Sequence, residues 1–215
     1  MQVNPKTLLT RISDSLNRDL PGKEAQLKMS RFGRSNEISI DFRVAAVLIL
    51  IFPKEDELHF ILTKRASKNS EDIHSGQISF PGGSREISDF ELSQTALRET
   101  NEEIGIQKDK ISVLGQLTEL YIPVSNFMVY PFLGYINEQP LYIPQIEEVE
   151  EIIEAPLELL LDPQTIHYKD INIRDGYTIK DIPYFNIYNH VVWGATAMIL
   201  SEFKEIIEQI KADKS

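Results

Sequence analysis

The stretch FPGGSREISDFELSQTALRETNEEIGI, residues 80–106, constrains the fold more than any other part of the chain. A short apolar run ends at its first two residues, and a glycine pair follows at Gly82 and Gly83. Two adjacent glycines let the backbone turn tightly or expose a carbonyl group. A long polar segment with helical spacing comes next. The stretch therefore predicts a strand, a glycine loop and a helix in rigid succession.

The helix signal after the glycine loop is the strongest in the chain. Ser88 or Asp89 is expected to cap its beginning, with Glu91 in the first turn. Gly105 is expected to end it, because glycine adopts the left-handed conformation of a helix C-cap at little cost. Apolar residues recur at steps of three and four along one side, which predicts that this side packs against the protein core.

Three glutamates of this helix are spaced so that their carboxylates share one face. Glu99, Glu102 and Glu103 stand at positions i, i+3 and i+4, which places their Cβ atoms about 6 Å apart. A solvated acidic face is one reading of this pattern. A cation site is the other, because Mg²⁺ prefers carboxylate oxygens and shares its remaining positions with water and substrate phosphates. Arg98, one residue off that face, could reach back to an acid near the helix start.

The remaining chain predicts one β-rich domain, residues 1–215, with helices packed on it. A buried strand is expected at 44–52, with its hairpin partner at 58–65. The N-terminal part, 1–40, predicts an amphipathic helix and a connecting segment, and Trp193 opens a final helix and is expected to pack in the core. Further strands are expected at 77–80, 111–120, 127–136, before Pro156 and on both sides of the Asp175-Gly176 turn, with a short helix after Pro156.

Composition excludes several classes of function. The formal net charge of -11, without a basic block, argues against binding nucleic acid or an anionic membrane surface. The absence of cysteine excludes disulfides, thiolate catalysis and cysteine-ligated metals. No signal-peptide core and no apolar run near the ~18 residues of a membrane span are present, so we expect a cytoplasmic protein. A homodimer is compatible with the sequence.

The helix and its loop resemble the Nudix box, the signature of hydrolases that cleave a nucleoside diphosphate linked to another moiety. The box occupies residues 82–106. One residue more than in the pattern separates Gly83 from Arg98, Asp89 stands in place of the first glutamate with Glu86 and Glu91 nearby, and Thr100 replaces an aliphatic residue. The acid that pairs with Arg98 therefore stays open. The matching residues are Arg98, Glu99, Glu102, Glu103, Gly105 and Ile106.

The segment before the box is similar to the motif of coenzyme A pyrophosphatases within the Nudix superfamily. Its loop is about two residues longer than the motif, and Asp72 stands where that motif has a second arginine. Residues 182–200 are similar to the C-terminal segment of the same subfamily. The matching residues are Leu62, Thr63, Arg65, Ala66, Gly76 and 80–83.

The resemblance implies an α+β fold, an α/β/α sandwich with a mixed sheet between helices. It also implies a Mg²⁺- or Mn²⁺-dependent enzyme that cleaves the pyrophosphate bond of coenzyme A or its derivatives into phosphopantetheine and adenosine 3′,5′-bisphosphate. Another nucleoside diphosphate derivative, such as ADP-ribose or a dinucleotide, is the alternative small-molecule substrate. A non-catalytic nucleotide-binding protein is a third possibility, although the complete glutamate set argues against it.

The resemblance also assigns roles to particular residues. The general base is left open among Glu147, Glu148, Glu150 and Glu151. The metal ligands implied are Glu99 and Glu103, with Glu102 as a further ligand or water-positioning group and the Gly82 carbonyl as a backbone ligand. The catalytic residues implied are Arg98, Glu99, Glu102 and Glu103, and the substrate-binding candidates are Lys64, Arg65 and His74. Trp193, Tyr184 and Phe185 are candidates for stacking on adenine, with core packing as the expected role of Trp193.

Overall fold

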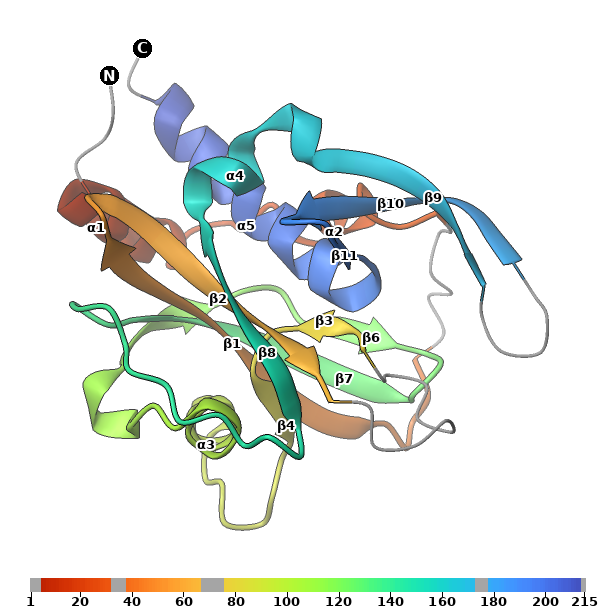
Figure 1. Cartoon of the computed structure of the whole chain (residues 1–215). Coiled ribbons are helices and arrows are strands. Elements are labelled where there is room, and N and C mark those ends of the chain that lie inside the picture. Colours follow the sequence, from red (N-terminus) through yellow and green to blue (C-terminus); the bar gives the residue numbers. More distant parts are fainter. Residues whose placement is uncertain (1–4, 32–37, 67–75, 173–177, 214–215) are drawn as a thin grey trace.

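A mixed sheet forms the centre of the protein in a computed structural model that describes residues 5–31, 38–66, 76–172 and 178–213 (Figure 1). Within the described residues the sheet has eight strands, five of which lie in the order β3-β2-β1-β7-β5. The other three pair off this path, β4 with β1, β6 with β7 and β8 with β2. Strands β1 and β7 run parallel, and the other pairs are antiparallel. The strands are β1 (Arg43–Lys54), β2 (Glu57–Arg65), β3 (Ile78–Ser79), β4 (Gly82–Ser84), β5 (Ser112–Gln116), β6 (Leu120–Ile122), β7 (Phe127–Tyr135) and β8 (Val149–Pro156).

The apolar run in β1 makes this strand the middle of the core. Side chains of a strand alternate between its faces, so Ile49 and Ile51 enter one buried cluster while Leu48, Leu50 and Phe52 enter the other. All five are fully buried. A strand buried on both faces reads as a continuous apolar run. The predicted strand at 44–52 and its hairpin partner are therefore confirmed.

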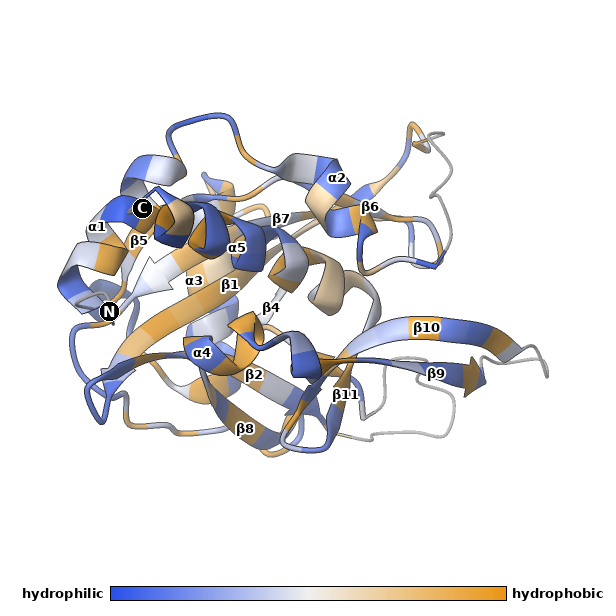
Figure 2. Cartoon of the chain, turned by 90° about the horizontal axis from the view of Figure 1, so that it is seen from above, coloured by the Kyte–Doolittle hydropathy of each residue, from blue (hydrophilic) through white to orange (hydrophobic). Residues whose placement is uncertain are grey.

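Helices cover both faces of this sheet, as the α+β sandwich requires (Figures 1 and 2). Ala96 and Ile104 of α3 pack into the cluster with Leu48 on one side. Helices α1 and α5 bring Ile12 and Phe203 into the cluster on the other side. The helices are α1 (Pro5–Ser15), α2 (Gly22–Leu27), α3 (Leu92–Ile104), α4 (Leu157–Leu161) and α5 (Gly194–Ala212), with short 3₁₀ turns at Lys108–Lys110 and Pro163–Thr165.

A second, three-stranded antiparallel sheet lies beside α5. Its order is β11-β10-β9. Phe185 and Ile187 of β10 and Val192 of β11 join the same apolar cluster as α5, which anchors this sheet to the main body. The strands are β9 (Ile166–Asn172), β10 (Thr178–Ile187) and β11 (His190–Val192).

Several expectations for these elements need correction. The segment after α1 contains a helix, α2, rather than only a connection. It forms because Ala25 and Gln26 are buried against α5, where the Ser201 hydroxyl donates to the Ala25 carbonyl at 2.7 Å. Trp193 is half-buried rather than part of the core. The Asp175-Gly176 turn lies outside the described residues. No helix in the described ranges has the length and apolarity needed to cross a membrane.

A buried carboxylate ties α5 to the rest of the fold. Glu202 is fully buried and accepts hydrogen bonds from Gln26 Nε2 at 2.9 Å and from the Thr118 hydroxyl at 2.7 Å. The Thr118 backbone N–H donates to it at 3.2 Å. Three segments far apart in the sequence therefore meet at one side chain.

We expect Glu202→Ala to lower the free energy of unfolding by about 3 kcal/mol, because buried donors on Gln26 and Thr118 lose their acceptor. Urea denaturation followed by circular dichroism measures this change. Glu205→Ala is the matched control, since Glu205 lies on the same helix in a surface pair with Lys28. Its effect should stay within about 0.5 kcal/mol, the scale of an exposed ion pair. Equal losses in the two variants would contradict the role given to Glu202.

Candidate active site

The glycine loop forms β4, whose backbone polar groups alternate in direction. The Pro81 carbonyl accepts from Leu48 of β1 and the Arg85 N–H donates to Val44 of β1. In an antiparallel ladder, every second residue directs its N–H and C=O groups away from the partner strand. Since Pro81 and Arg85 bond to β1, the alternating residues Gly82 and Ser84 direct their backbone groups away from β1.

Those groups meet side chains of α3. The Gly82 N–H donates to Glu103 Oε2 at 3.3 Å, and the Ser84 carbonyl accepts from Arg98 Nη2 at 2.8 Å. The packing leaves no room for a side chain at Gly83, where a Cβ atom would lie 2.5 Å from the carboxyl carbon of Glu99. The glycine pair thus lets an acidic helix approach the edge of β4 directly.

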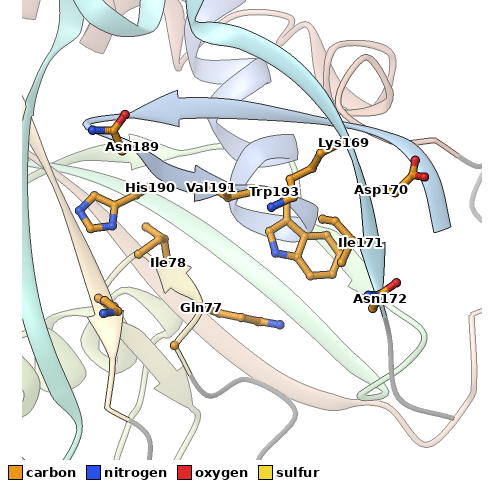
Figure 3. A pocket seen from close by; sticks show the side chains of 12 residues that line it. Gln77, Ile78, Lys169, Asp170, Ile171, Asn172, Asn189, His190, Val191 and Trp193 are labelled. Atoms are coloured by element: carbon orange, nitrogen blue, oxygen red, sulfur yellow. The ribbon is translucent and has the colours of Figure 1, made fainter. Parts of the chain in front are cut away.

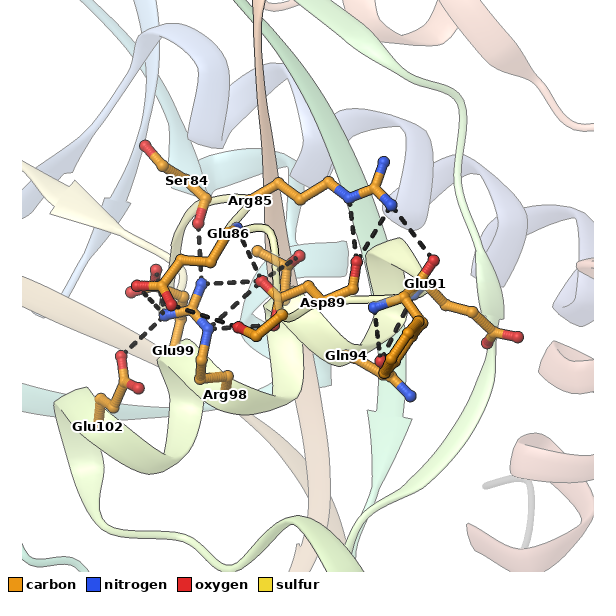
Figure 4. Close-up of polar contacts among 12 residues, drawn as sticks. Ser84, Arg85, Glu86, Asp89, Glu91, Gln94, Arg98, Glu99 and Glu102 are labelled. Atoms are coloured by element: carbon orange, nitrogen blue, oxygen red, sulfur yellow. Dashed lines mark hydrogen bonds and ion pairs between the residues drawn. The ribbon is translucent and has the colours of Figure 1, made fainter.

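Arg98 pairs with Asp89, which answers the question that the sequence left open (Figure 4). Arg98 Nη2 lies 3.0 Å from Asp89 Oδ2, and Nε lies 3.2 Å from Oδ1. Both side chains are buried, and the Thr95 hydroxyl also donates to Asp89 at 2.9 Å. The hydrogen bond from Arg98 is the main reason why the pKa of Asp89 falls to about 2. Glu86 stands farther from Arg98, at 3.8 Å, and is exposed.

This pairing changes where the helix begins. Asp89 is occupied by Arg98, and the N-cap is Glu91 rather than Ser88 or Asp89. Gln94 Oε1 accepts from the Phe90 N–H at 2.9 Å and so satisfies one backbone donor ahead of the first turn. The predicted end is confirmed, since Gly105 adopts a φ of 77°.

The three glutamates of the shared face have different environments. The side chain of Glu102 is 53% exposed, that of Glu99 16% and that of Glu103 5%. Arg98 Nη1 donates to Glu99 and to Glu102, each at 2.9 Å, and so stands between them. Within the described ranges no three acidic or histidine side chains form a ready-made cation site. Glu99 and Glu103 are the pair that faces the glycine loop.

Burial raises the pKa of both inner glutamates. For Glu103 it rises to about 8, mainly through desolvation, with Arg65 opposing the shift and the charges of Glu99 and Glu148 adding to it. The pKa of Glu99 is raised by burial as well, with Arg98 opposing. Glu148, one of the four candidate bases, is thus close enough to act on both inner carboxylates.

The other acidic candidates are directed elsewhere. Glu150 forms an ion pair with Lys64, and Glu151 lies 3.4 Å from His190 Nε2. Glu147 is exposed. The fold therefore distinguishes Glu148 from the other three candidate bases. The sequence could not make this distinction, because all four glutamates lie in one acidic run.

Two of the three predicted substrate-binding residues, Lys64 and Arg65, lie at the end of β2 and face different neighbours. Arg65 Nη1 lies 3.8 Å from Glu103 Oε1, and its buried Nε has no hydrogen-bond partner among the described residues. Lys64 precedes it and pairs with Glu150 of β8. The structure therefore brings Arg65, and not Lys64, to the glutamates. His74 and Asp72 lie outside the described residues.

A comparison with known families decides what this arrangement belongs to. The family model described as NUDIX domain matches residues 42–181. The chain belongs to the Nudix hydrolase family. The match includes the sheet core, the glycine loop, the acidic helix and β8.

Relatives of this Nudix hydrolase occur in plants and bacteria. Nudix hydrolase 15, mitochondrial, of Arabidopsis thaliana is 36% identical over 73% of this chain, and the match covers 55% of that protein. This chain thus spans about half the length of the plant relative. An uncharacterized Nudix hydrolase NudL of Photorhabdus laumondii is 33% identical over 80% of this chain and 88% of the bacterial protein.

A solved structure shows the same fold. The NUDIX domain of Shewanella oneidensis NrtR, crystallised with ADP ribose, superposes with a TM-score of 0.52 at 14% identity. The superposition covers 85% of this chain and 97% of that one. The likeness confirms the Nudix fold expected from the sequence.

Nudix hydrolases generally use divalent metal ions, and the donor set here fits such ions. Glu99 and Glu103 supply carboxylate oxygens beside the outward-turned backbone of Gly82. Burial and the neighbouring carboxylates of Glu99 and Glu148 disfavour the ionised form of Glu103, and a divalent cation bound beside it would favour that form. Hard cations prefer oxygen ligands of this kind.

We expect Asp89→Asn to lower the free energy of unfolding at pH 7 by about 2 kcal/mol, because the buried Arg98 charge loses its main partner. Asp89 has a folded pKa of about 2 against an ordinary 3.8. Its stabilising effect is present above 3.8 and is lost as the pH falls toward 2, so the deficit of the variant shrinks over that range. Urea titrations of the wild-type chain and the variant at pH 7 and pH 3 measure the loss of stability at neutral pH and its decrease in acid.

Glu86→Gln is the control for this pairing, because it removes the exposed acid at 3.8 Å from Arg98. Its effect on stability should stay within about 0.5 kcal/mol. A larger loss of stability in Glu86→Gln than in Asp89→Asn would show that Glu86, and not Asp89, is the main partner of Arg98.

Proposed function

We propose that this Nudix hydrolase uses Mg²⁺ or Mn²⁺ to cleave the pyrophosphate bond of coenzyme A or its derivatives, giving phosphopantetheine and adenosine 3′,5′-bisphosphate. The observation that carries the proposal is the position of Arg65. This residue belongs to the motif similar to that of coenzyme A pyrophosphatases, and it faces the buried Glu103 with an unpartnered Nε. Arginine binds phosphate groups through several donors in a fixed fork.

The acidic helix supplies the proposed metal ligands. Glu99 and Glu103 would be the principal ligands, with Glu102 as a further ligand or a group that positions water. The Gly82 carbonyl is the proposed backbone ligand, and the alternation of β4 supports it, because N–H and C=O of one residue point to the same side of a strand. A divalent ion bound there would offset the charge of the diphosphate and lower the pKa of bound water.

Three other residues would bind the substrate, position the metal ligands and activate water. Arg65 would hold the diphosphate beside the carboxylates. Arg98 acts as a positioning residue, since it is fixed by Asp89 and directs Glu99 and Glu102 through its remaining donors. Glu148 is the acid outside the box that the geometry supports for activating water, because its charge acts on both inner glutamates.

A second substrate class has its own support. Asp72 replaces the second arginine of the coenzyme A pyrophosphatase motif, and losing one cation weakens the case for a substrate with an additional 3′-phosphate. ADP-ribose or a dinucleotide would then be cleaved by the same residues. The lack of cysteine suits a reducing compartment, and we place the activity in the cytoplasm within a single domain.

Incubation of the purified chain with coenzyme A and Mg²⁺ should yield adenosine 3′,5′-bisphosphate, detected by chromatography. A parallel panel of ADP-ribose and diadenosine polyphosphates ranks the substrates by kcat/KM.

Glu103→Gln should lose at least ~100-fold in kcat, the scale of removing one strong electrostatic contributor. Glu138→Gln, an exposed pair with Lys110, is the control and should keep wild-type activity. Turnover by Glu103→Gln at the wild-type rate would sink the assignment of the site.

Metal binding should release a proton at neutral pH. A Glu103 carboxyl with a pKa of about 8 is mostly protonated at pH 7, and a metal ligand must be deprotonated. Calorimetric titration of the chain with Mn²⁺ in buffers of different ionisation enthalpy should therefore report release of about one proton per site at pH 7 and little above pH 9. The affinity should rise with pH through this range. Binding at pH 7 without proton release would contradict a metal site built on a protonated Glu103 carboxyl.

A further inference from the structure

A hollow of about 510 Å³ lies between the end of β2, β3 and the three-stranded sheet (Figure 3). It is separate from the glutamate site, because Lys64 lines the hollow while the next residue, Arg65, faces Glu103. Sites for small molecules commonly have volumes of about 300–1,000 Å³. The hollow is therefore large enough to hold part of a nucleotide.

Trp193 gives the hollow an aromatic wall. It is the chain's single tryptophan and the N-cap of α5, where the backbone is extended and carries the indole out of the core. Figure 3 shows the indole among the lining residues, with Ile171 beside it and Ile78 and Gln77 on the other side of the space. A half-buried indole with apolar neighbours offers a surface on which a flat ring can stack.

Carboxamides form much of the remaining lining. Gln77, Asn172 and Asn189 reach it from three different segments. Asn172 Oδ1 already accepts from the Thr178 hydroxyl at 2.7 Å, which fixes the orientation of its amide. Asparagine and glutamine present a donor and an acceptor together and can pair with the edge of adenine.

The charges of the hollow favour the neutral end of a nucleotide over its phosphates. Lys64 is paired with Glu150, and His190 stands beside Glu151. Lys169 and Asp170 also line the hollow and carry opposite formal charges, so the lining has little net positive charge. Arg65 faces the opposite side, toward the glutamates, and is the better phosphate partner.

We infer that this hollow binds the purine base and ribose of the substrate, with the base stacked on Trp193. The inference rests on the proposed function for its link to catalysis, since Lys64 and Arg65 are consecutive and one nucleotide would pass from the hollow to the glutamates around the end of β2. Binding of the base itself does not require metal or turnover.

The fluorescence of the single tryptophan tests the hollow directly. Adenosine 3′,5′-bisphosphate, added in the presence of EDTA, should quench the emission of Trp193 saturably in the wild-type chain and equally in Glu103→Gln. Adenosine should quench as well, whereas phosphopantetheine should not. N-acetyltryptophanamide under the same conditions corrects for absorption by the ligand. Absence of saturable quenching, or quenching by phosphopantetheine alone, would overturn the inference.

A substitution provides the second measurement. Trp193→Leu should weaken binding of adenosine 3′,5′-bisphosphate, measured by calorimetry, by about 10- to 100-fold, the range that base stacking on an aromatic side chain contributes. It should raise the KM of the cleaved nucleotide by a similar factor with kcat changed less than about 3-fold. Tyr168→Leu makes the same type of change at an exposed residue of β9 outside the hollow, and should alter neither value.

The outcomes separate the two proposals. Quenching of wild type without turnover of any nucleotide would retain the hollow and remove the hydrolase function proposed for coenzyme A. Turnover of coenzyme A with no quenching, and with an unchanged KM in Trp193→Leu, would retain that function and remove the hollow. Unchanged calorimetric binding in a folded Trp193→Leu variant would also overturn the assignment of the base to this site.

Discussion

The buried pair between Arg98 and Asp89 is the interaction on which the arrangement of the site depends. The guanidinium joins the loop to the helix, because it also donates to the Ser84 carbonyl and to Glu99. Removing a charge from water is costly unless it is paired and hydrogen-bonded. Here Asp89 supplies the pairing, so the free donors of Arg98 can hold two glutamates that would otherwise repel one another.

Burying the carboxylates of Glu99 and Glu103 costs free energy that their contacts within the protein offset only in part. Glu103 is nearly excluded from solvent, receives one backbone hydrogen bond from Gly82, and faces Arg65 at 3.8 Å. These contacts do not offset its desolvation, because its pKa still rises to about 8. A fold gains nothing in stability from such a carboxyl, and perturbed groups of this kind gather at functional sites. The conflict therefore argues for a cation-dependent role over a solvated acidic face.

Sequence periodicity predicted the elements that bury long apolar runs and missed the features fixed by distant contacts. The spacing of Glu99, Glu102 and Glu103 gave one helical face, but only the tertiary structure shows Arg98 between two of them. Asp89 resembles a helix cap in local sequence, and its real partner lies nine residues later. Helix α2 is too short to carry a periodic signal and is held by Glu202, 176 residues from Gln26.

The alternation of β2 would allow the proposed recognition of the base and the proposed cleavage to share one strand end. Consecutive side chains of a strand point to opposite faces, and β2 places Arg65 toward the buried glutamates while Lys64 lines the hollow with Trp193. Phosphates need fixed cations and metal, whereas a nucleobase needs a flat apolar surface and paired amides. A single pocket would have to combine these conflicting demands. Two faces separated by one strand allow each demand to be met by different residues, and the proposed base-binding face could then vary without disturbing the acidic helix.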